Sequence, residues 1–329
     1  MGFERGGSRE PSHAARDPHT LRDWVLTRRS ALRVSTLPLI LLLGGSDPLP
    51  VAKRYGAYVT NEPWPDVTPH HALEEKIGAK LPTMSWFQDW STTWLTRQAS
   101  AATESGHDLL ICWEPIIDRE PIRFSEIVDG VYDSHLEAYF SAAASHPRPV
   151  MIRPFHEMNG NWYPWALANG RSDIVSSIEE WIAAWQHLVL LQRRISGGHI
   201  NWLWCVNNID IGGFPAERYF PGEEYVDAVG MDCYNGYGPW ESFYQLAAPM
   251  YHRLIRLGAK VPVIVAETGC REPTAGENRS KAVWLQALFD EHRLTRLTNV
   301  NFFSSNKEHD WRLDSSVEAL RTAQRNLVR

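Results

Sequence analysis

The sequence predicts a single (β/α)8 TIM barrel, and three observations support this fold. From Arg54 to the C-terminus, short apolar runs alternate with longer helical patterns, which is the rhythm of parallel β/α units. Eight such runs share about 280 residues, a usual length for this barrel. Polar side chains follow the apolar runs more often than they precede them. That asymmetry is expected where chemistry takes place at the carboxyl ends of barrel strands.

Each expected element follows from its hydrophobic pattern. The expected strands are Tyr55–Val59, Leu81–Phe87, Asp108–Trp113, Pro149–Phe155, Ile200–Val206, Ala228–Tyr234, Pro262–Ala266 and Val300–Phe303. The expected helices are His71–Ala79, Thr92–Ser105, Phe124–Ser145, Ser172–Ile195, Trp240–Leu257, Asn278–Arg296 and Ser315–Asn326. Only the connection between Val206 and Ala228 lacks a long helical pattern, and we expect at most a short helix within Pro215–Glu224.

An open, doubly wound sheet is the alternative fold. A nucleotide-binding sheet of this kind carries a glycine-rich phosphate loop after an early strand. No GxGxxG or P-loop motif occupies that place, and Gly212-Gly213 follows a late strand instead. The closed barrel is therefore the favoured prediction.

The composition is that of a globular protein with an excess of tryptophan. Of 329 residues, 43% are hydrophobic, which is enough for a sizeable core. The net charge of −6 and the lack of a long basic run argue against a nucleic-acid partner. Seven of the fifteen tryptophans fall near strand ends: Trp86, Trp90, Trp113, Trp162, Trp165, Trp240 and Trp311. One such residue would be ordinary core, but their shared position favours a groove for stacking rings.

The cysteines and histidines show no metal-binding spacing. Cys112, Cys205, Cys233 and Cys270 form no CxxC pair, so we interpret them as small buried residues, with a disulfide between two of them left open. The thirteen histidines are scattered, and nothing resembles HExxH. We therefore expect no catalytic metal and no cofactor.

The N-terminal residues 1–52 resemble a leader rather than part of the domain. Paired arginines in Thr27–Arg33 precede the apolar run Val34–Leu43, which is short for a membrane helix but suits an export signal of the twin-arginine type. We expect export to an extracellular or periplasmic location, with a short membrane anchor as the alternative. Residues 53–329 then form one catalytic domain, expected to be monomeric.

The stretch Met151–Trp165 leads from an apolar strand directly into polar and aromatic side chains. The chemically active members are Arg153, His156, Glu157, Asn159, Trp162 and Trp165. A carboxyl group beside a histidine, an arginine and indoles suits sugar chemistry, because a general acid needs a tuned pKa and pyranose rings stack on aromatic faces. A structural ion pair at a strand end is the alternative.

A second carboxylate, Glu267, ends the apolar run Pro262–Ala266. Carboxylates on the fourth and seventh strands would face each other across the barrel mouth. A separation of about 5 Å would make one the nucleophile and the other the acid/base of a retaining glycosidase. A role for Glu267 as a capping partner of the following segment is the alternative.

Several segments together resemble glycoside hydrolase family 26, which contains β-mannanases and some members that act on mixed-linkage glucan or xylan. They are Arg153–Trp165, Asn201–Asn207, Tyr219–Asp227, Gly230–Asn235, Val263–Gly269 and Asp310–Arg312. The resemblance implies a retaining mechanism with Glu157 as acid/base and Glu267 as nucleophile. It also implies that Tyr234 hydrogen-bonds the nucleophile and that His156, Trp162 and Trp311 line the sugar subsite at the cleavage point.

The remaining candidates for substrate binding are weaker. Asn207, Asn235 and Asp232 are expected to bind hydroxyl groups, and Arg153 either holds Glu267 or braces the site from beneath. Asn159 and Trp165 complete the fourth-strand cluster, and Trp113 forms either a stacking subsite or a cap on the barrel, as do Trp86 and Trp90.

The expected function is hydrolysis of a β-1,4-linked polysaccharide of the mannan, mixed-linkage glucan or xylan type. A non-catalytic glycan-binding barrel, or an accessory protein of exopolysaccharide assembly, is the alternative, but binding alone needs no matched pair of carboxylates. The segment after the second strand offers Gln88 and Asp89, where a mannanase would be expected to carry histidine. The sequence therefore leaves the sugar open.

Overall fold

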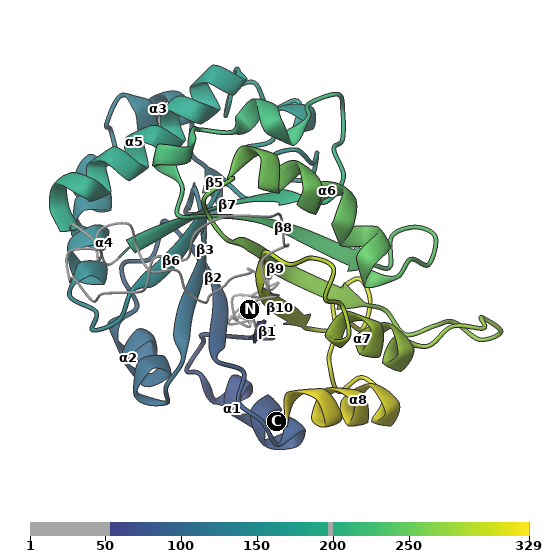
Figure 1. Ribbon diagram of the computed structural model, residues 1–329. Coiled ribbons are helices and arrows are strands. Elements are labelled where there is room, and N and C mark those ends of the chain that lie inside the picture. Colours follow the sequence, from purple (N-terminus) through teal and green to yellow (C-terminus); the bar gives the residue numbers. More distant parts are fainter. Residues whose placement is uncertain (1–52, 197–199, 329) are drawn as a thin grey trace, which may run out of the picture.

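Eight parallel strands close into a barrel in the order β1-β10-β9-β8-β7-β6-β3-β2 (Figure 1). The computed structural model describes residues 53–196 and 200–328, so the expected leader lies outside the described residues. The strands of the barrel are β1 (Arg54–Val59), β2 (Thr83–Asp89), β3 (Asp108–Glu114), β6 (Val150–Pro154), β7 (Ile200–Asn207), β8 (Ala228–Asn235), β9 (Val263–Cys270) and β10 (Leu297–Ser304). The predicted (β/α)8 fold is confirmed.

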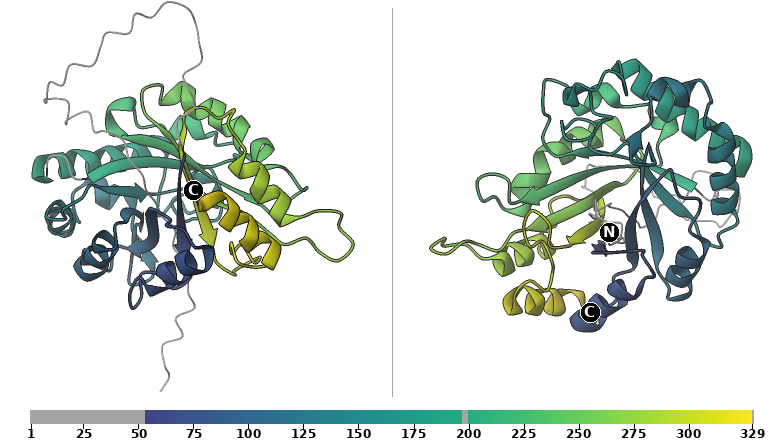
Figure 2. Two further views of the ribbon diagram at one scale, coloured as in Figure 1. Left: turned by 60° about the horizontal axis from the view of Figure 1, so that its bottom comes forward. Right: turned by 180° about the vertical axis from the view of Figure 1, so that it is seen from behind.

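The helices form a ring around the barrel in both views of Figure 2. They are α1 (Thr68–Ile77), α2 (Thr96–Glu104), α3 (Phe124–Val128), α4 (Asp133–Ala144), α5 (Ile178–Ser196), α6 (Phe243–Leu257), α7 (Lys281–Phe289) and α8 (Val317–Leu327). As expected, only short 3₁₀ turns, Ala216–Tyr219 and Glu223–Tyr225, join β7 to β8. A small hairpin of β4 (Ile116–Ile117) and β5 (Glu120–Pro121) follows β3.

Two predicted helices are shorter than their hydrophobic patterns. The predicted helix Phe124–Ser145 is split into α3 and α4, because Gly130 between them has a φ of +75°, which a helix does not accept. The predicted helix Asn278–Arg296 ends at Phe289. There the Glu291 carboxylate accepts a hydrogen bond from the backbone N–H of Arg293, and such local contacts compete with helix formation.

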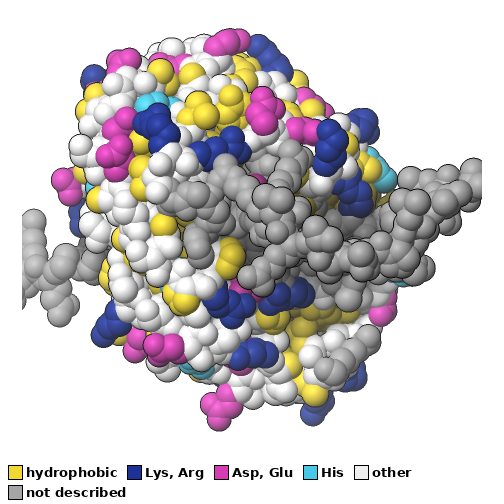
Figure 3. Space-filling view, turned by 60° about the vertical axis from the view of Figure 1, so that its left-hand side comes forward, with side chains coloured by type: hydrophobic (Ala, Val, Ile, Leu, Met, Phe, Trp, Pro, Cys, Tyr) yellow, Lys and Arg dark blue, Asp and Glu magenta, His cyan; other side chains and the backbone are white. Residues whose placement is uncertain are grey.

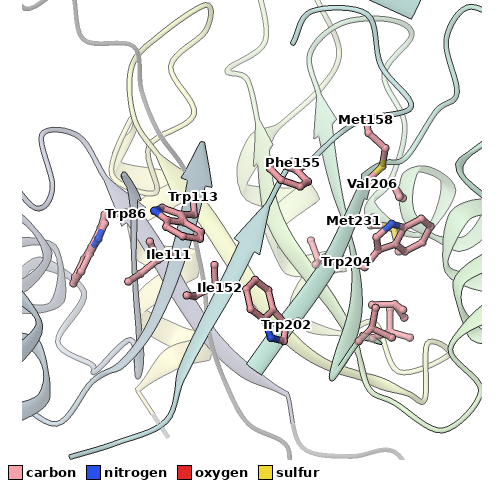
Figure 4. Close-up of a cluster of buried hydrophobic side chains, with 14 of the residues drawn as sticks. Trp86, Ile111, Trp113, Ile152, Phe155, Met158, Trp202, Trp204, Val206 and Met231 are labelled. Carbon is pink, nitrogen blue, oxygen red and sulfur yellow. The ribbon is translucent and has the colours of Figure 1, made fainter. Parts of the chain in front are cut away.

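A tryptophan-rich layer fills the space between the barrel and its helices. Trp113 of β3 stacks on Tyr139 of α4 with ring centroids 4.5 Å apart, and Trp202 and Trp204 project from β7 into the same layer (Figure 4). Because side chains alternate along a strand, Trp113 points outward while its neighbour Cys112 points into the barrel. Trp86, Trp90 and Trp113 are all fully buried core residues, which favours the second of the two expected roles, a cap on the barrel, over a stacking subsite.

The structure also shows the state of the thiols, the distribution of surface charge and the character of the helices. All four cysteines are free and buried, so no disulfide forms among them. Basic and acidic side chains are interspersed over the face shown in Figure 3. Within residues 53–196 and 200–328, no helix has both the length and the apolar character needed to cross a membrane.

Candidate active site

A buried arginine joins three strands at the centre of the barrel. Arg153 of β6 points inward and is fully buried, and its guanidinium donates hydrogen bonds to Glu267 Oε1 of β9 and to Asp232 Oδ2 of β8. A desolvated guanidinium needs such anionic partners, because an unpaired buried charge is very costly. Arg153 therefore braces the site from beneath, and Asp232, which is also fully buried, is its counter-ion rather than a hydroxyl-binding group.

Glu267 reaches the barrel interior through a β-bulge. The register between β8 and β9 shifts between Met231 and Asp232, so that Met231 pairs with Val265 but Asp232 pairs with Glu267. Ala266 lies in the barrel core, and simple alternation would turn the next residue outward. The extra residue of the bulge turns the carboxylate of Glu267 inward instead.

The partners of Glu267 favour its ionised form. Its Oε2 accepts a 2.6 Å hydrogen bond from the Tyr234 hydroxyl, and its Oε1 accepts one from Arg153. On balance the pKa of Glu267 is raised by burial, although the charge of Arg153 and the hydrogen bonds from Tyr234 and Arg153 lower it. The cation and the hydroxyl donor favour the charged form of this carboxylate and fix its orientation, as a nucleophile requires.

Glu157 lies in the turn that follows β6. Its φ of +53° is unusual for a residue with a side chain, and its backbone N–H donates to the Cys205 carbonyl oxygen of β7 at 3.0 Å. Burial and the nearby negative charge of Glu267 raise the pKa of Glu157 to about 7. A carboxyl group with a pKa near neutrality is suited to donate a proton and later take one back.

Trp162 covers Glu157 and remains half exposed. Its indole Nε1 donates to Glu157 Oε2 at 2.7 Å, while 47% of the residue is open to solvent. The ring lies over Gly160, where a Cβ atom would be only 2.6 Å from the indole. The exposed indole face beside the acid is a surface on which a pyranose ring can stack.

His156 and Trp165 lie beneath this surface. Both are fully buried, and Trp165 Nε1 donates to the backbone oxygen of His156 at 2.7 Å. Burial and the charge of Arg153 hold the pKa of His156 well below its usual range, so the ring is neutral. Tyr163 stacks on Trp165 with centroids 4.4 Å apart. His156 and Trp165 therefore shape the site without contacting solvent.

Asn159 organises the loop after β7. Its side chain is fully buried, accepts from the backbone N–H of Asn207 at 2.8 Å and donates to Asp210 Oδ1 at 2.8 Å. Asn207 in turn donates from Nδ2 to the carbonyl oxygen of Ile209 at 2.7 Å. Both polar atoms of the Asn159 side chain are thus bonded within the protein, which favours a structural role over the predicted role in substrate binding.

Trp311 forms the wall behind Tyr234. It is almost fully buried in the loop after β10, with its ring centroid 5.0 Å from that of Tyr234. A Cβ atom on Gly269 would lie 3.0 Å from the same indole. Trp311 thus supports the tyrosine that holds Glu267, and in this structure its face is not open to solvent.

Lys281, which no sequence pattern singles out, anchors the loop that carries Trp311. This lysine opens α7 and is buried, and its Nζ donates to the carbonyl oxygens of Asp310 and Arg312 and to Ser315 Oγ at 2.7–2.9 Å. Burial lowers the pKa of Lys281 to about 8. A single lysine at a helix start gives no sequence signal for this role.

Other missed residues lie around the mouth. Lys307, in the loop after β10, contributes positive charge that lowers the pKa of both Glu157 and Glu267. Tyr237, in the loop after β8, and Trp64, in the loop after β1, are exposed aromatic residues. All three residues lie in loops that have no clear sequence pattern. Only the folded barrel shows that these loops surround its mouth.

Comparisons with known proteins find relatives among glycoside hydrolases. The family model described as "Glycosyl hydrolase family 26" matches residues 137–291. Endoglucanase H of Acetivibrio thermocellus is 32% identical over 278 residues, which cover 81% of this chain and 29% of that protein. Mannan endo-1,4-beta-mannosidase A and B of Caldalkalibacillus mannanilyticus is 31% identical over 130 residues, covering 39% and 23% respectively. The chain thus spans less than a third of the length of these curated relatives.

Solved structures share the barrel. GH26C from Muricauda superposes with a TM-score of 0.58 at 18% identity, covering 85% of each chain. A beta-mannanase from a symbiotic protist of the termite Reticulitermes speratus gives a TM-score of 0.58 at 13% identity, covering 84% of this chain and 87% of that one. By its sequence match, the family model and the shared fold, the chain belongs to glycosyl hydrolase family 26.

Proposed function

We propose that the protein is a retaining endo-β-glycanase, with Glu157 as acid/base and Glu267 as nucleophile. The observation that carries the proposal is the contrast between the partners of the two carboxylates. Glu267 is bound by a cation and a hydroxyl, which favour its charged form, whereas the donor at Glu157 is the neutral indole of Trp162. Two carboxyl groups with environments that separate their pKa values are typical of this chemistry.

In the first step, protonated Glu157 gives its proton to the glycosidic oxygen. Glu267 attacks the anomeric carbon, the bond to the departing sugar breaks, and a covalent glycosyl–enzyme ester forms. The leaving group departs as a neutral alcohol. Arg153 and Tyr234 hold the attacking carboxylate in place, so little conformational entropy is lost on reaching the transition state.

In the second step, the ester no longer carries the charge of Glu267. That charge is one of the two causes that raise the pKa of Glu157, so the pKa falls once the ester forms. Glu157 then takes a proton from water as the water oxygen attacks the anomeric carbon. The ester bond breaks, Glu267 regains its charge, and the product keeps the configuration of the substrate.

The expected substrate is a β-1,4-linked polysaccharide, and we rank β-glucan before mannan and xylan. Support comes from the relatives: the match to endoglucanase H extends over 278 residues, whereas the match to the mannosidase extends over 130. Exposed aromatic residues in the loops after β1, β6 and β8 offer several stacking surfaces for a long chain. Hydrolysis of lichenan, glucomannan, mannan and xylan, with product analysis, tests this ranking.

Azide distinguishes the roles of the two carboxylates. With a substrate that has a good leaving group, azide should rescue Glu267→Ala and give the glycosyl azide of inverted configuration. The same reagent should rescue Glu157→Ala at the second step and give the azide of retained configuration. Glu120→Gln, a change at an exposed carboxylate, serves as control. Swapped configurations would exchange the two roles, and glycan binding without turnover by the unaltered protein would favour the non-catalytic barrel.

Export remains part of the proposal. The paired arginines and the apolar run in residues 27–43 support it. Fusion of residues 1–52 to a reporter that is active only after export would test it. Replacement of Arg28 and Arg29 by lysine should abolish the signal, and a reporter unaffected by this change would contradict the proposal.

A further inference from the structure

A second cluster of ionisable side chains lies outside the active site, between α1 and the amino-terminal ends of β2 and β3. His70 and Glu74 are one turn apart on α1, and His107 directly precedes β3. Glu62, in the loop after β1, lies beside His70. His107 directly precedes β3 and Leu81 precedes β2, so these two members lie at the amino-terminal ends of the strands, and the mechanism does not use the cluster.

Three potential ligand atoms converge in this cluster. His107 Nε2 lies 2.9 Å from Glu74 Oε1, and His70 Nε2 lies 4.0 Å from the same oxygen. All three atoms are within 4.8 Å of one another. Bonds of about 2.0–2.1 Å in a tetrahedral zinc site place ligand atoms about 3.3 Å apart. Side-chain shifts of about an ångström would therefore complete the coordination.

The other ring nitrogens of the two histidines face acceptors. His70 Nδ1 lies 3.5 Å from Glu62 Oε2, and His107 Nδ1 lies 3.3 Å from the Ala102 carbonyl oxygen and 2.9 Å from Ser105 Oγ. Without a metal ion, His107 Nε2 donates to Glu74 Oε1 at 2.9 Å, and His70 Nε2 faces the Leu81 carbonyl oxygen at 3.2 Å. When an ion takes the place of these protons on Nε2, the acceptors at Nδ1 can hold the remaining proton of each ring, which is how metal-binding histidines are held.

Glu62 and Glu74 bring two carboxylates to the cluster. Glu62 is buried, and its Oε2 lies at an ion-pair distance from His70 Nδ1. His70 Nε2 faces the Leu81 carbonyl oxygen at 3.2 Å as well as Glu74. Two carboxylates and a carbonyl oxygen therefore surround the buried ring of His70. Oxygen and nitrogen donors gathered in this way can hold a divalent ion.

We propose that His70, Glu74 and His107 bind a zinc ion, with Glu62 orienting His70. Two imidazole nitrogens and one carboxylate oxygen form a donor set suited to Zn²⁺. Both histidines are fully buried, but the Glu74 side chain is 14% exposed, which leaves a path for the ion and for a water molecule as fourth ligand. The ion joins α1 to the segment that leads into β3, and so stabilises the fold without entering the reaction.

Metal binding to the whole protein tests the proposal directly. After chelator treatment and dialysis, calorimetric titration with Zn²⁺ should show one ion bound per chain. A free Zn²⁺ concentration about a hundred times Kd should raise Tm by about 5 °C. Co²⁺ in place of Zn²⁺ should give the visible absorption of a tetrahedral site. Failure to bind Zn²⁺ would overturn the proposal.

Variants assign the ligands. Glu74→Gln keeps the size of the side chain and an acceptor for His107 and for the backbone of Leu81, so it should fold, but its Zn²⁺ affinity should fall at least about tenfold. His107→Ala should lose binding altogether. His252→Ala, at an exposed histidine of α6, is the matched control and should bind as the unaltered protein does. Equal affinity in Glu74→Gln and the control would place the zinc elsewhere.

Discussion

Replacing the acid/base by its neutral isostere should stabilise the protein in alkaline solution. In Glu157→Gln the side chain keeps its size and can still accept the hydrogen bond from Trp162. The wild-type carboxyl has a raised pKa, so the folded state binds the proton more tightly than the unfolded state does. This contribution is fully present below the unfolded pKa and is lost as the pH rises through about 7.

The size of the effect follows from the two pKa values. A carboxyl group whose pKa rises from 4.5 to about 7 on folding loses about 3 kcal/mol of stabilisation between acidic and alkaline solution. Glutamine does not titrate. The variant should therefore gain up to about 3 kcal/mol relative to wild type as the pH rises from about 4 to about 9.

Urea unfolding across this pH range measures the difference. Glu120→Gln, at an exposed carboxylate, controls for the loss of a charge and should show little pH-dependent gain. A stability difference between wild type and Glu157→Gln that stays constant with pH would refute the assignment of a raised pKa. So would a wild type that becomes relatively more stable above pH 7.

Four further predictions concern activity and packing. Because Glu157 must be protonated, kcat/KM should fall about tenfold per pH unit above about pH 7, and a flat profile would contradict its role as acid. Tyr234→Phe should lower kcat by about tenfold or more through the loss of one hydrogen bond to the nucleophile, with an unchanged far-UV spectrum; an unaltered kcat would make that bond dispensable. Gly160→Ala should displace the ring of Trp162 and raise KM more than it lowers Tm, and normal kinetics would show that the indole can move freely. Trp113→Ala should cost about 3–5 kcal/mol in urea unfolding while KM stays near the wild-type value, and a large rise in KM would restore it as a substrate contact.

The sequence carried enough information for the barrel and for the two carboxylates. Eight apolar runs of strand length, each followed by a helical pattern, leave few alternatives to a closed parallel sheet. Glu157 and Glu267 stood out because ionisable residues end apolar strands, a place where burial without function is costly.

What the sequence could not supply was the direction in which side chains point. The sequence shows that Trp113 is an aromatic residue near a strand end. Only the structure shows that its neighbour Cys112 faces the barrel interior and that Trp113 faces the helices. The bulge before Glu267 is invisible in an apolar run, yet it reverses the orientation of the carboxylate.

Contacts between side chains of separate elements could not be predicted from the sequence either. Lys281 reaches three acceptors in a loop about 30 residues away along the chain. The pair His70 and Glu74 has the spacing of helix neighbours, but the third member of the cluster, His107, comes from the start of another strand. A search for contiguous motifs such as HExxH cannot find a site assembled in this way.

The guanidinium at the centre of the barrel and the carboxylates that neutralise it come from different halves of the chain. The segment that ends with β7 carries Arg153, and the segment that begins with β8 carries both acids that neutralise it, Asp232 and Glu267. Either half alone would bury charge without a counter-ion, so neither can close into a small independent barrel at low cost. Two fragments divided between β7 and β8 should therefore associate with each other. Their association would place Arg153 beside Glu267 and so assemble the surroundings of the nucleophile.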